Sequence, residues 1–197
     1  MTGEKCVTRL LEVIANDIVP LTRVGVSAGN KVFGAAILHK EDLSLVIAGS
    51  NNENENPLWH GEVHTLKLFY EMPARERPQT GDCLFLATHE PCSLCLSAIT
   101  WTGFDNFYYL FGYEDTAKAF NIPHDLKILQ EVFAVKGGQY VRENAFWTSH
   151  SMLEMIAGLP ETERERANDR VAHLTTAYAK LSATYQKNKA TSSIPLP

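Results

Sequence analysis

His60-Gly61-Glu62 and Glu90-Pro91-Cys92-Ser93-Leu94-Cys95 are the two short stretches that decide how this chain folds and what chemistry it can carry. Together they hold one imidazole and two thiols, all of which Zn²⁺ accepts as ligands in proteins. A catalytic zinc takes three protein ligands and leaves a fourth position for water. Cys92 and Cys95 lie three positions apart, a spacing that puts both sulfurs on one turn of a helix. We therefore predict that His60, Cys92 and Cys95 bind zinc.

Glu62 follows the predicted ligand His60 by two residues, so its carboxylate is held close to the metal. A carboxylate in this place can take a proton from water and pass it to a reacting group. The order H-x-E and then P-C-x-x-C is the signature of zinc deaminases, in which the glutamate is an acid/base and not a ligand. A zinc protease of the H-E-x-x-H type is disfavoured because Gly61, not glutamate, follows His60.

One structural alternative stays open for the same residues. His64 lies four positions after His60 and could join Cys92 and Cys95 in a closed Cys₂His₂ site that admits no water. In that case the chain would be a non-catalytic zinc-stabilised interaction domain, and Glu62 would have no role.

Length and composition limit the class of protein. The chain has 197 residues, 45% of them hydrophobic, which suits one domain with a real core. The net charge of −5 offers no general attraction for phosphate backbones and disfavours nucleic acid as a partner. No apolar stretch is long enough to span a membrane, and no signal peptide pattern opens the chain. Free thiols without a disulfide framework favour the cytoplasm.

Hydrophobic periodicity predicts alternating helices and strands. The predicted strands are Val32 to Leu38, Leu43 to Ala48, Cys83 to Thr88, Asn106 to Phe111 and Val132 to Val135. The predicted helices are a first helix stopping at Pro20, one starting at His60, Pro91 to Trp101, turns within Glu114 to Gln130, Ala145 to Leu159, and Glu161 to Gln186. We expect a core at 1–140, a helical C-terminal extension of the same domain at 141–190, and a loose tail at 191–197.

Over about Val32 to Asp115 the chain resembles the cytidine deaminase superfamily. Val32-Phe33-Gly34-Ala35-Ala36 is similar to the P-[FIV]-G-A strand that lines the family's pocket floor, and Gly49-Ser50-Asn51 is similar to its G-x-N. The resemblance implies an α/β fold, a three-layer α/β/α sandwich with a mixed five-stranded sheet, here followed by C-terminal helices. It also implies a homodimer, because family members are commonly dimeric or tetrameric.

The resemblance further implies hydrolytic deamination of a small nucleobase, nucleoside or related heterocycle, with release of ammonia. Residues 60–66 are similar to fungal cytosine deaminases, whereas residues 90–101 look more like bacterial guanine deaminases. Guanine deaminases usually carry Phe-Asp-Asp where this chain has Phe120 followed by Asn-Ile-Pro. The expected substrate contacts are Asn51, the backbone of Phe33 and Ala35, and two less typical residues, Trp59 and His89.

A second enzymatic interpretation is a tRNA adenosine deaminase, which the same fold supports. The acidic charge balance and the lack of a dense Lys/Arg run disfavour it.

Overall fold

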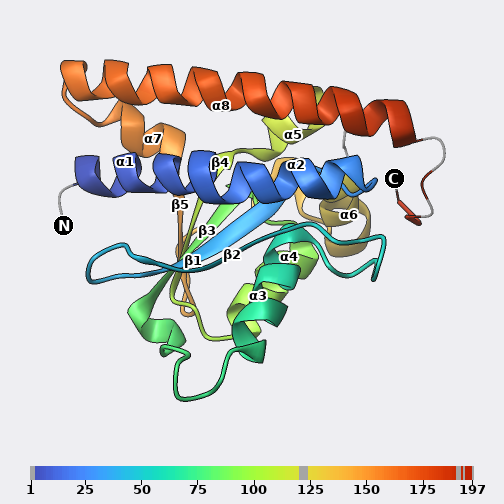
Figure 1. Cartoon of the computed structure of the whole chain (residues 1–197), viewed down its shortest axis with the longest axis horizontal. Helices are drawn as coiled ribbons and strands as arrows, with labels where there is room; N and C mark the ends of the chain where they lie inside the picture. Colours follow the sequence, from blue (N-terminus) through green and yellow to red (C-terminus); the bar gives the residue numbers. More distant parts are fainter. Residues whose placement is uncertain (1–2, 120–123, 190–191, 193, 197) are drawn as a thin grey trace.

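The computed structural model describes residues 3–119, 124–189, 192 and 194–196, which form one mixed five-stranded sheet between two layers of helices (Figure 1). The strands are β1 (Gly34–His39), β2 (Leu45–Ser50), β3 (Cys83–His89), β4 (Asn106–Phe111) and β5 (Thr148–Ser151). The α-helices are α1 (Gly3–Val13), α2 (Val19–Ser27), α3 (Gly61–Glu71), α4 (Ser93–Trp101), α5 (Tyr113–Ala119), α6 (His124–Phe133), α7 (Met152–Ala157) and α8 (Glu161–Asn188). The predicted α/β sandwich is confirmed.

The sheet has the order β2-β1-β3-β4-β5. β1 pairs antiparallel with both β2 and β3, with Ala35 opposite Gly49 on one side and Ala87 on the other. β3, β4 and β5 run parallel, so each connection between them crosses over a face of the sheet. β1 and β2 thus form a hairpin, whereas the parallel neighbour of β4 is β5 and not a strand at Val132 to Val135.

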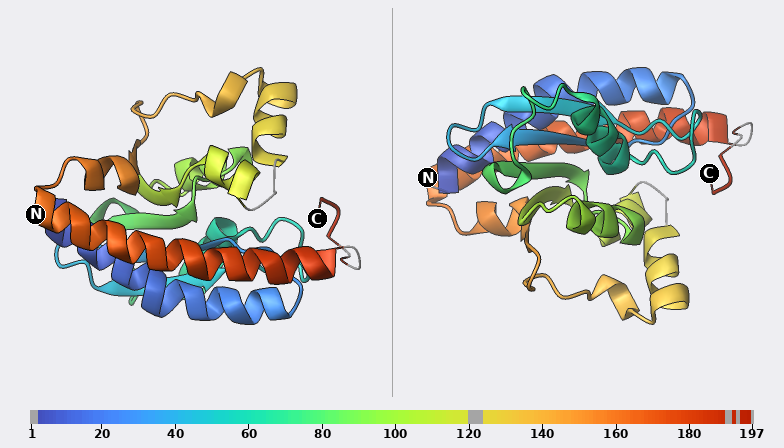
Figure 2. Two further views of the ribbon diagram at one scale, coloured as in Figure 1. Left: turned by 90° about the horizontal axis from the view of Figure 1, so that it is seen from above. Right: turned by 90° about the horizontal axis from the view of Figure 1, so that it is seen from below.

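The two faces of the sheet carry separate hydrophobic clusters. One cluster joins the sheet to α1, α2, α7 and α8, and its largest fully buried side chains include Tyr178 and Tyr185 of α8. The other lies under α3 and α4 and contains Phe69, Phe85 and Phe107. Burying one such phenylalanine contributes about 1.5–3 kcal/mol. The two views of Figure 2 show helices covering both faces, which holds α3 and α4 firmly on the sheet.

The first helix does not stop at Pro20, so that prediction is wrong. Helical turns continue from α1 through a π-helical segment, Ile14–Ile18, into α2. Here the backbone N–H of Val19 bonds the carbonyl of Ile14, five residues back. Proline has no N–H to donate and its ring crowds the preceding turn. The wider π turn accommodates it at the start of α2, where its missing donor costs little.

The fifth strand was also predicted in the wrong place. Val132 and Phe133 end α6 and are exposed, whereas β5 lies at Thr148–Ser151, inside a segment expected to be helical. β5 is a half-buried edge strand with the polar sequence Thr-Ser-His-Ser, which has no apolar alternation to mark it. Its pairing is reinforced by His150, whose ring stacks on Tyr108 of β4 with centroids 4.5 Å apart.

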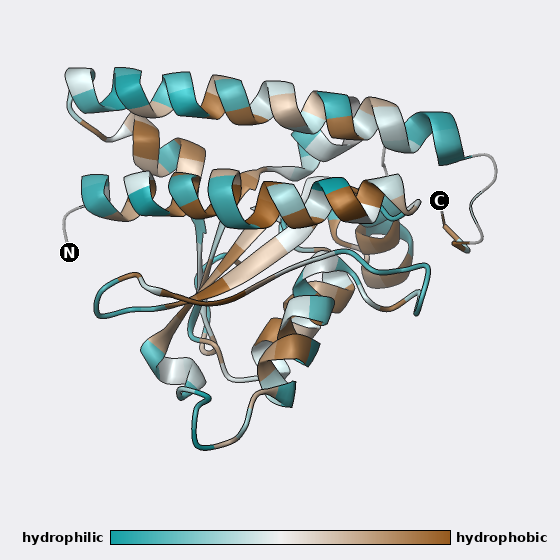
Figure 3. Ribbon diagram, viewed as in Figure 1, coloured by the Kyte–Doolittle hydropathy of each residue, from teal (hydrophilic) through white to brown (hydrophobic). Residues whose placement is uncertain are grey.

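The C-terminal helix α8 runs along α1 and α2 and presents a mostly hydrophilic surface (Figure 3). Its buried residues form one stripe, Ala167, Leu174, Tyr178, Leu181, Ser182 and Tyr185. Among the residues that the structure describes, no helix is both long and apolar enough to cross a membrane.

Candidate metal centre

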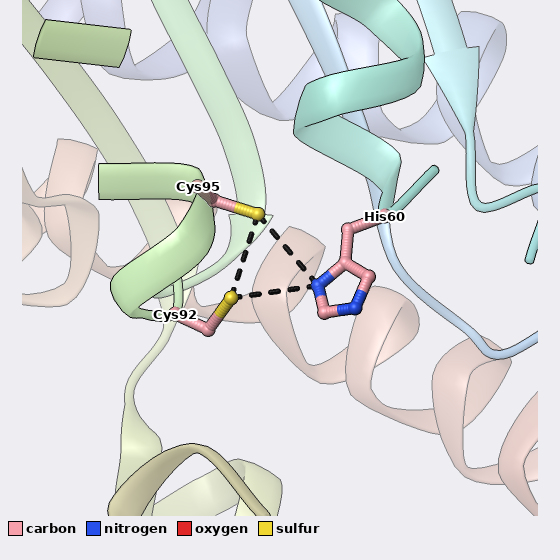
Figure 4. Close-up of side chains that lie close together, drawn as sticks. All are labelled: His60, Cys92 and Cys95. Carbon is pink, nitrogen blue, oxygen red and sulfur yellow. Dashed lines mark hydrogen bonds between the residues drawn. The ribbon is translucent and has the colours of Figure 1, made fainter. Parts of the chain in front are cut away.

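The two sequence motifs meet at the N-terminal ends of two neighbouring helices. His60 directly precedes α3, and Cys92 directly precedes α4, with Cys95 in the first turn of that helix. Figure 4 shows the three side chains pointing toward one another from these two segments. The N-terminus of a helix favours negative charge, so α4 favours the thiolate forms that a metal requires.

The distances within this group fit a tetrahedral zinc. His60 Nδ1 lies 3.4 Å from Cys92 Sγ and 3.7 Å from Cys95 Sγ, and the two sulfurs are 3.6 Å apart. Zinc with ideal bond lengths would separate its ligand atoms by about 3.6 Å for N···S and about 3.8 Å for S···S. Within the described part of the chain, these are the His, Cys, Asp and Glu side chains gathered closely enough to hold a metal ion.

The three candidate ligands differ in protonation. Burial, followed by the neighbouring Cys92, raises the pKa of Cys95, so this thiol and the His60 imidazole would have to release protons when a metal binds. A hydrogen bond from Cys95 and the neighbouring His60 hold the pKa of Cys92 well below its usual value, although burial opposes them. Burial lowers the pKa of His60, but the hydrogen bond and charge of Cys92, with Glu53 and Glu62, outweigh it and raise that pKa to about 9. One thiolate is therefore available before a cation arrives.

Glu62, in the first turn of α3, extends its carboxylate toward the group formed by His60, Cys92 and Cys95. Its carboxylate is buried, and Oε2 lies 3.3 Å from Cys95 Sγ. Burial, followed by the charge on Cys92, raises the pKa of Glu62 to about 7. A carboxyl group with a pKa close to neutral can both accept and release a proton under physiological conditions.

His64 does not join this group. Its Nδ1 lies 2.7 Å from the carbonyl oxygen of Ser50, and its ring stacks on Trp59 with centroids 5.5 Å apart. The His64 side chain is thus engaged by Ser50 and Trp59 and is not part of the group that could hold a metal ion. This arrangement disfavours the closed Cys₂His₂ site.

A cavity of about 220 Å³ opens beside the group. Apolar side chains from several segments form much of its wall, among them Phe33, Leu58, Leu94, Ile128 and Ile194. Three charged residues that the sequence analysis did not select, Lys31, Glu53 and Asp125, complete the wall next to His60. Nothing in the sequence distinguishes them from surface charges, since their burial depends on how distant loops meet.

Of the predicted substrate contacts, Phe33 lines this cavity. Asn51 is buried next to the lining residue Glu53 but does not itself line the cavity. Its Oδ1 accepts a hydrogen bond from the backbone N–H of Glu53, 3.2 Å away. Its Nδ2 has no partner among the described residues, which leaves one buried donor to be satisfied. The side chain of Ala35 packs in the core on the α3 side of the sheet.

Trp59 and His89, the other two predicted contacts, do not line the cavity. Trp59 stacks on His64 and carries the ammonium of Lys67 over its ring, 4.9 Å from the centroid. His89 is buried against the rings of Phe33, Phe111 and Tyr178. These contacts support a packing role for both residues. The distinctive Phe120 to Pro123 stretch lies outside the described residues.

Asp125, near the start of α6, provides a test of the electrostatics in this cavity. Burial, followed by the negative charge of Cys92, raises the pKa of Asp125 to about 8. A carboxyl group whose pKa is higher in the folded state stabilises the fold at low pH, and this contribution is lost as the pH rises toward 8. In zinc-free protein, we expect Asp125→Asn to gain stability over the parent as the pH rises from 4 to 8, by at most about 5 kcal/mol for a pKa shift of this size.

Urea unfolding at several pH values measures this difference in stability. Glu131→Gln, which changes an exposed carboxylate on the same helix, is the matched control and should follow the parent. If Asp125→Asn and the parent had the same pH dependence, the carboxyl group would not be raised in pKa.

Comparison with known proteins finds similar sequences and structures for the part of the chain that holds this site. Residues 19–111 match the family model of the cytidine and deoxycytidylate deaminase zinc-binding region. The guanine deaminase of Bacillus subtilis strain 168 is 32% identical over 104 residues, which cover 51% of this chain and 64% of that protein. The alignment thus spans less than two thirds of this relative's length.

At least one solved structure shares the fold. A protein in complex with 2,6-diaminopurine superposes with a TM-score of 0.51 at 18% identity, covering 93% of this chain and 84% of that one. A guanine deaminase from Nitrosomonas europaea gives a TM-score of 0.49 at 18% identity, covering 79% and 81% of the two chains. The matched region includes both sequence motifs and all three candidate metal ligands. Residues 19–111, just under half of the chain, are therefore similar to the zinc-binding region of cytidine and deoxycytidylate deaminases.

Proposed function

We propose that this protein is a zinc-dependent hydrolytic deaminase that replaces an exocyclic amine of a small aminated heterocycle by a carbonyl and releases ammonia. The observation that carries the proposal is the buried carboxylate of Glu62 beside the group formed by His60, Cys92 and Cys95. Three ligands leave a coordination position open, and an acid/base stands next to it.

Each residue has a separate task in this reaction. His60, Cys92 and Cys95 would hold zinc, which when bound supplies the Lewis acidity that brings the pKa of a water molecule close to neutral. Glu62 takes one proton from water as the hydroxide attacks the ring carbon, and delivers it to a ring nitrogen. It then takes the second proton from the hydroxyl now bonded to that carbon and delivers it to the amine, so that the C–N bond breaks, ammonia leaves and the carbonyl forms. Its pKa of about 7 supports both steps.

The size of the cavity favours a free base over a nucleoside. A volume of about 220 Å³ is below the ~300–1,000 Å³ of pockets that take drug-sized ligands. Asn51 would hold the ring through its unpartnered Nδ2, with Phe33 as an apolar wall. Because a guanine deaminase is 32% identical over the shared region, we favour guanine or a related aminopurine as the substrate.

Ammonia release from a panel of bases and nucleosides tests this proposal. We expect turnover of a free base, with guanine and cytosine as the first candidates, and at least about 10-fold slower turnover of the matching nucleoside, because the sugar does not fit. A zinc-loaded protein that releases no ammonia from the panel would favour the zinc-scaffold alternative. Salt-sensitive binding of tRNA would instead favour the alternative function, a tRNA adenosine deaminase.

Two further properties belong to the same proposal. We place the enzyme in the cytoplasm because its four cysteines are free and buried. We also expect a homodimer, which sedimentation analysis would detect.

A further inference from the structure

A buried ion pair lies directly behind the imidazole of His60. Lys31 Nζ is 2.9 Å from Glu53 Oε1, and both side chains are about 95% or more buried. The same Oε1 lies 3.6 Å from His60 Nε2, the nitrogen that points away from the two cysteines. The imidazole is therefore placed between two thiols on its Nδ1 side and a carboxylate on its Nε2 side.

The two loops that carry this ion pair are tied to each other. Asn54, next to Glu53, donates its backbone N–H to Asn30 Oδ1 at 2.9 Å and its Nδ2 to the carbonyl of Ala28 at 2.6 Å. Asn30 directly precedes Lys31 and is itself buried. The asparagine-rich segment at 51–56 thus holds together the two loops that carry Lys31 and Glu53.

Stability alone does not explain why two charges are buried here. Removing a carboxylate and an ammonium from water costs several kcal/mol each, and an apolar pair of similar volume often serves a fold as well or better. A carboxylate behind a histidine ligand has another well-known use, because it fixes the ring orientation and increases the basicity of the ligating nitrogen. Glu53 stands in the place where a carboxylate does this.

We propose that Lys31 and Glu53 form a positioning pair for His60: Glu53 orients the imidazole so that Nδ1 faces the two cysteines, and Lys31 holds the Glu53 carboxylate in place. The 3.6 Å contact is an ion-pair distance, longer than a normal hydrogen bond, so Glu53 acts mainly through its charge and its fixed position. The proposal rests on zinc binding by His60, which is part of the function proposed above.

Zinc affinity, measured by competition with a chelator, tests the role of Glu53. We expect Glu53→Gln to weaken zinc binding about 10- to 100-fold, the range for residues that orient a metal ligand. Glu55→Gln is the matched control, since it removes an exposed carboxylate from the same loop, and it should bind zinc like the parent. Glu53→Asp keeps the charge but withdraws it by one methylene, so we expect weaker binding here as well.

The Lys31→Met variant distinguishes a positioning role of Lys31 from a direct effect of its positive charge on the metal. Removing a nearby positive charge would by itself strengthen the binding of a cation. The positioning role predicts the opposite, a loss of about 10-fold, because the Glu53 carboxylate loses the group that holds it. In the Lys31→Met/Glu53→Gln double variant the loss should equal that of Glu53→Gln alone. Tighter zinc binding by Lys31→Met, or additive losses in the double variant, would overturn the proposal.

Thermal unfolding of the zinc-free proteins shows whether a variant is less stable on its own, so that a folding defect is not mistaken for a loss of zinc affinity. If Glu53→Gln bound zinc like the parent, the positioning role would be refuted while the proposed function stood. If the parent itself bound no zinc, the proposed function would fail first. If Lys31→Met were too unstable to purify, Glu53→Asp would decide the question, since unchanged zinc affinity in that variant refutes the positioning role.

Discussion

Glu62→Gln is expected to lower the rate of ammonia release at least about 100-fold and to leave the zinc content unchanged. Glutamine has the same shape as glutamate but cannot accept and return a proton. Because Glu62 is buried and its Oε2 lies next to Cys95 Sγ, the amide fits the same space without disturbing the ligands. The loss should appear in kcat more than in KM, since the carboxylate acts on reacting atoms.

A second glutamate on the same helix supplies the control for this variant. Glu71 is exposed at the other end of α3 and bridges to Lys67 at 2.8 Å. Glu71→Gln should release ammonia at the parent rate. A Glu62→Gln protein that kept the parent rate would exclude Glu62 as the acid/base, and with it the proposed reaction.

The grouping of the candidate site residues could be predicted because residues that are close in sequence stay close in the fold. Cys92 and Cys95 share a helical turn wherever that helix lies, and His60 and Glu62 are joined by a single residue. The strands flanking these motifs were also predicted, since β3 and β4 are almost wholly buried and read as continuous apolar runs.

What the sequence did not reveal depends on contacts between distant segments. Lys31 and Glu53 are 22 positions apart, and nothing in either loop marks them as buried until the asparagine hydrogen bonds bring the loops together. β5 was missed because an edge strand needs no hydrophobic alternation. The end of the first helix was wrongly predicted at Pro20 because the π turn before this proline lets the helix continue. Trp59 and His89 stand next to the motifs in sequence, yet their rings are engaged elsewhere.

Removal of zinc should have the largest effect on stability. A ligand that binds only the folded state at about 1,000 times its Kd adds roughly 4 kcal/mol to the free energy of unfolding. For a domain of this size each kcal/mol moves Tm by about 2–4 °C, so the zinc-free protein should melt roughly 10 °C lower. Without the metal, the partly exposed His60 and the buried Cys92 and Cys95 side chains keep only weak contacts with one another.

Two cysteine variants decide whether this shift belongs to the proposed site. Cys95→Ser replaces a thiolate ligand by a hydroxyl that zinc binds poorly, so adding zinc should no longer raise Tm. Cys6→Ser changes a buried cysteine of α1, outside the metal group, and should keep the full zinc-dependent shift even if its own Tm falls. The comparison is made within each variant, between its zinc-loaded and zinc-free forms, so the cost of burying a hydroxyl cancels. A zinc-dependent shift that survived in Cys95→Ser would place the metal elsewhere, because two remaining ligands do not hold zinc at the concentrations used.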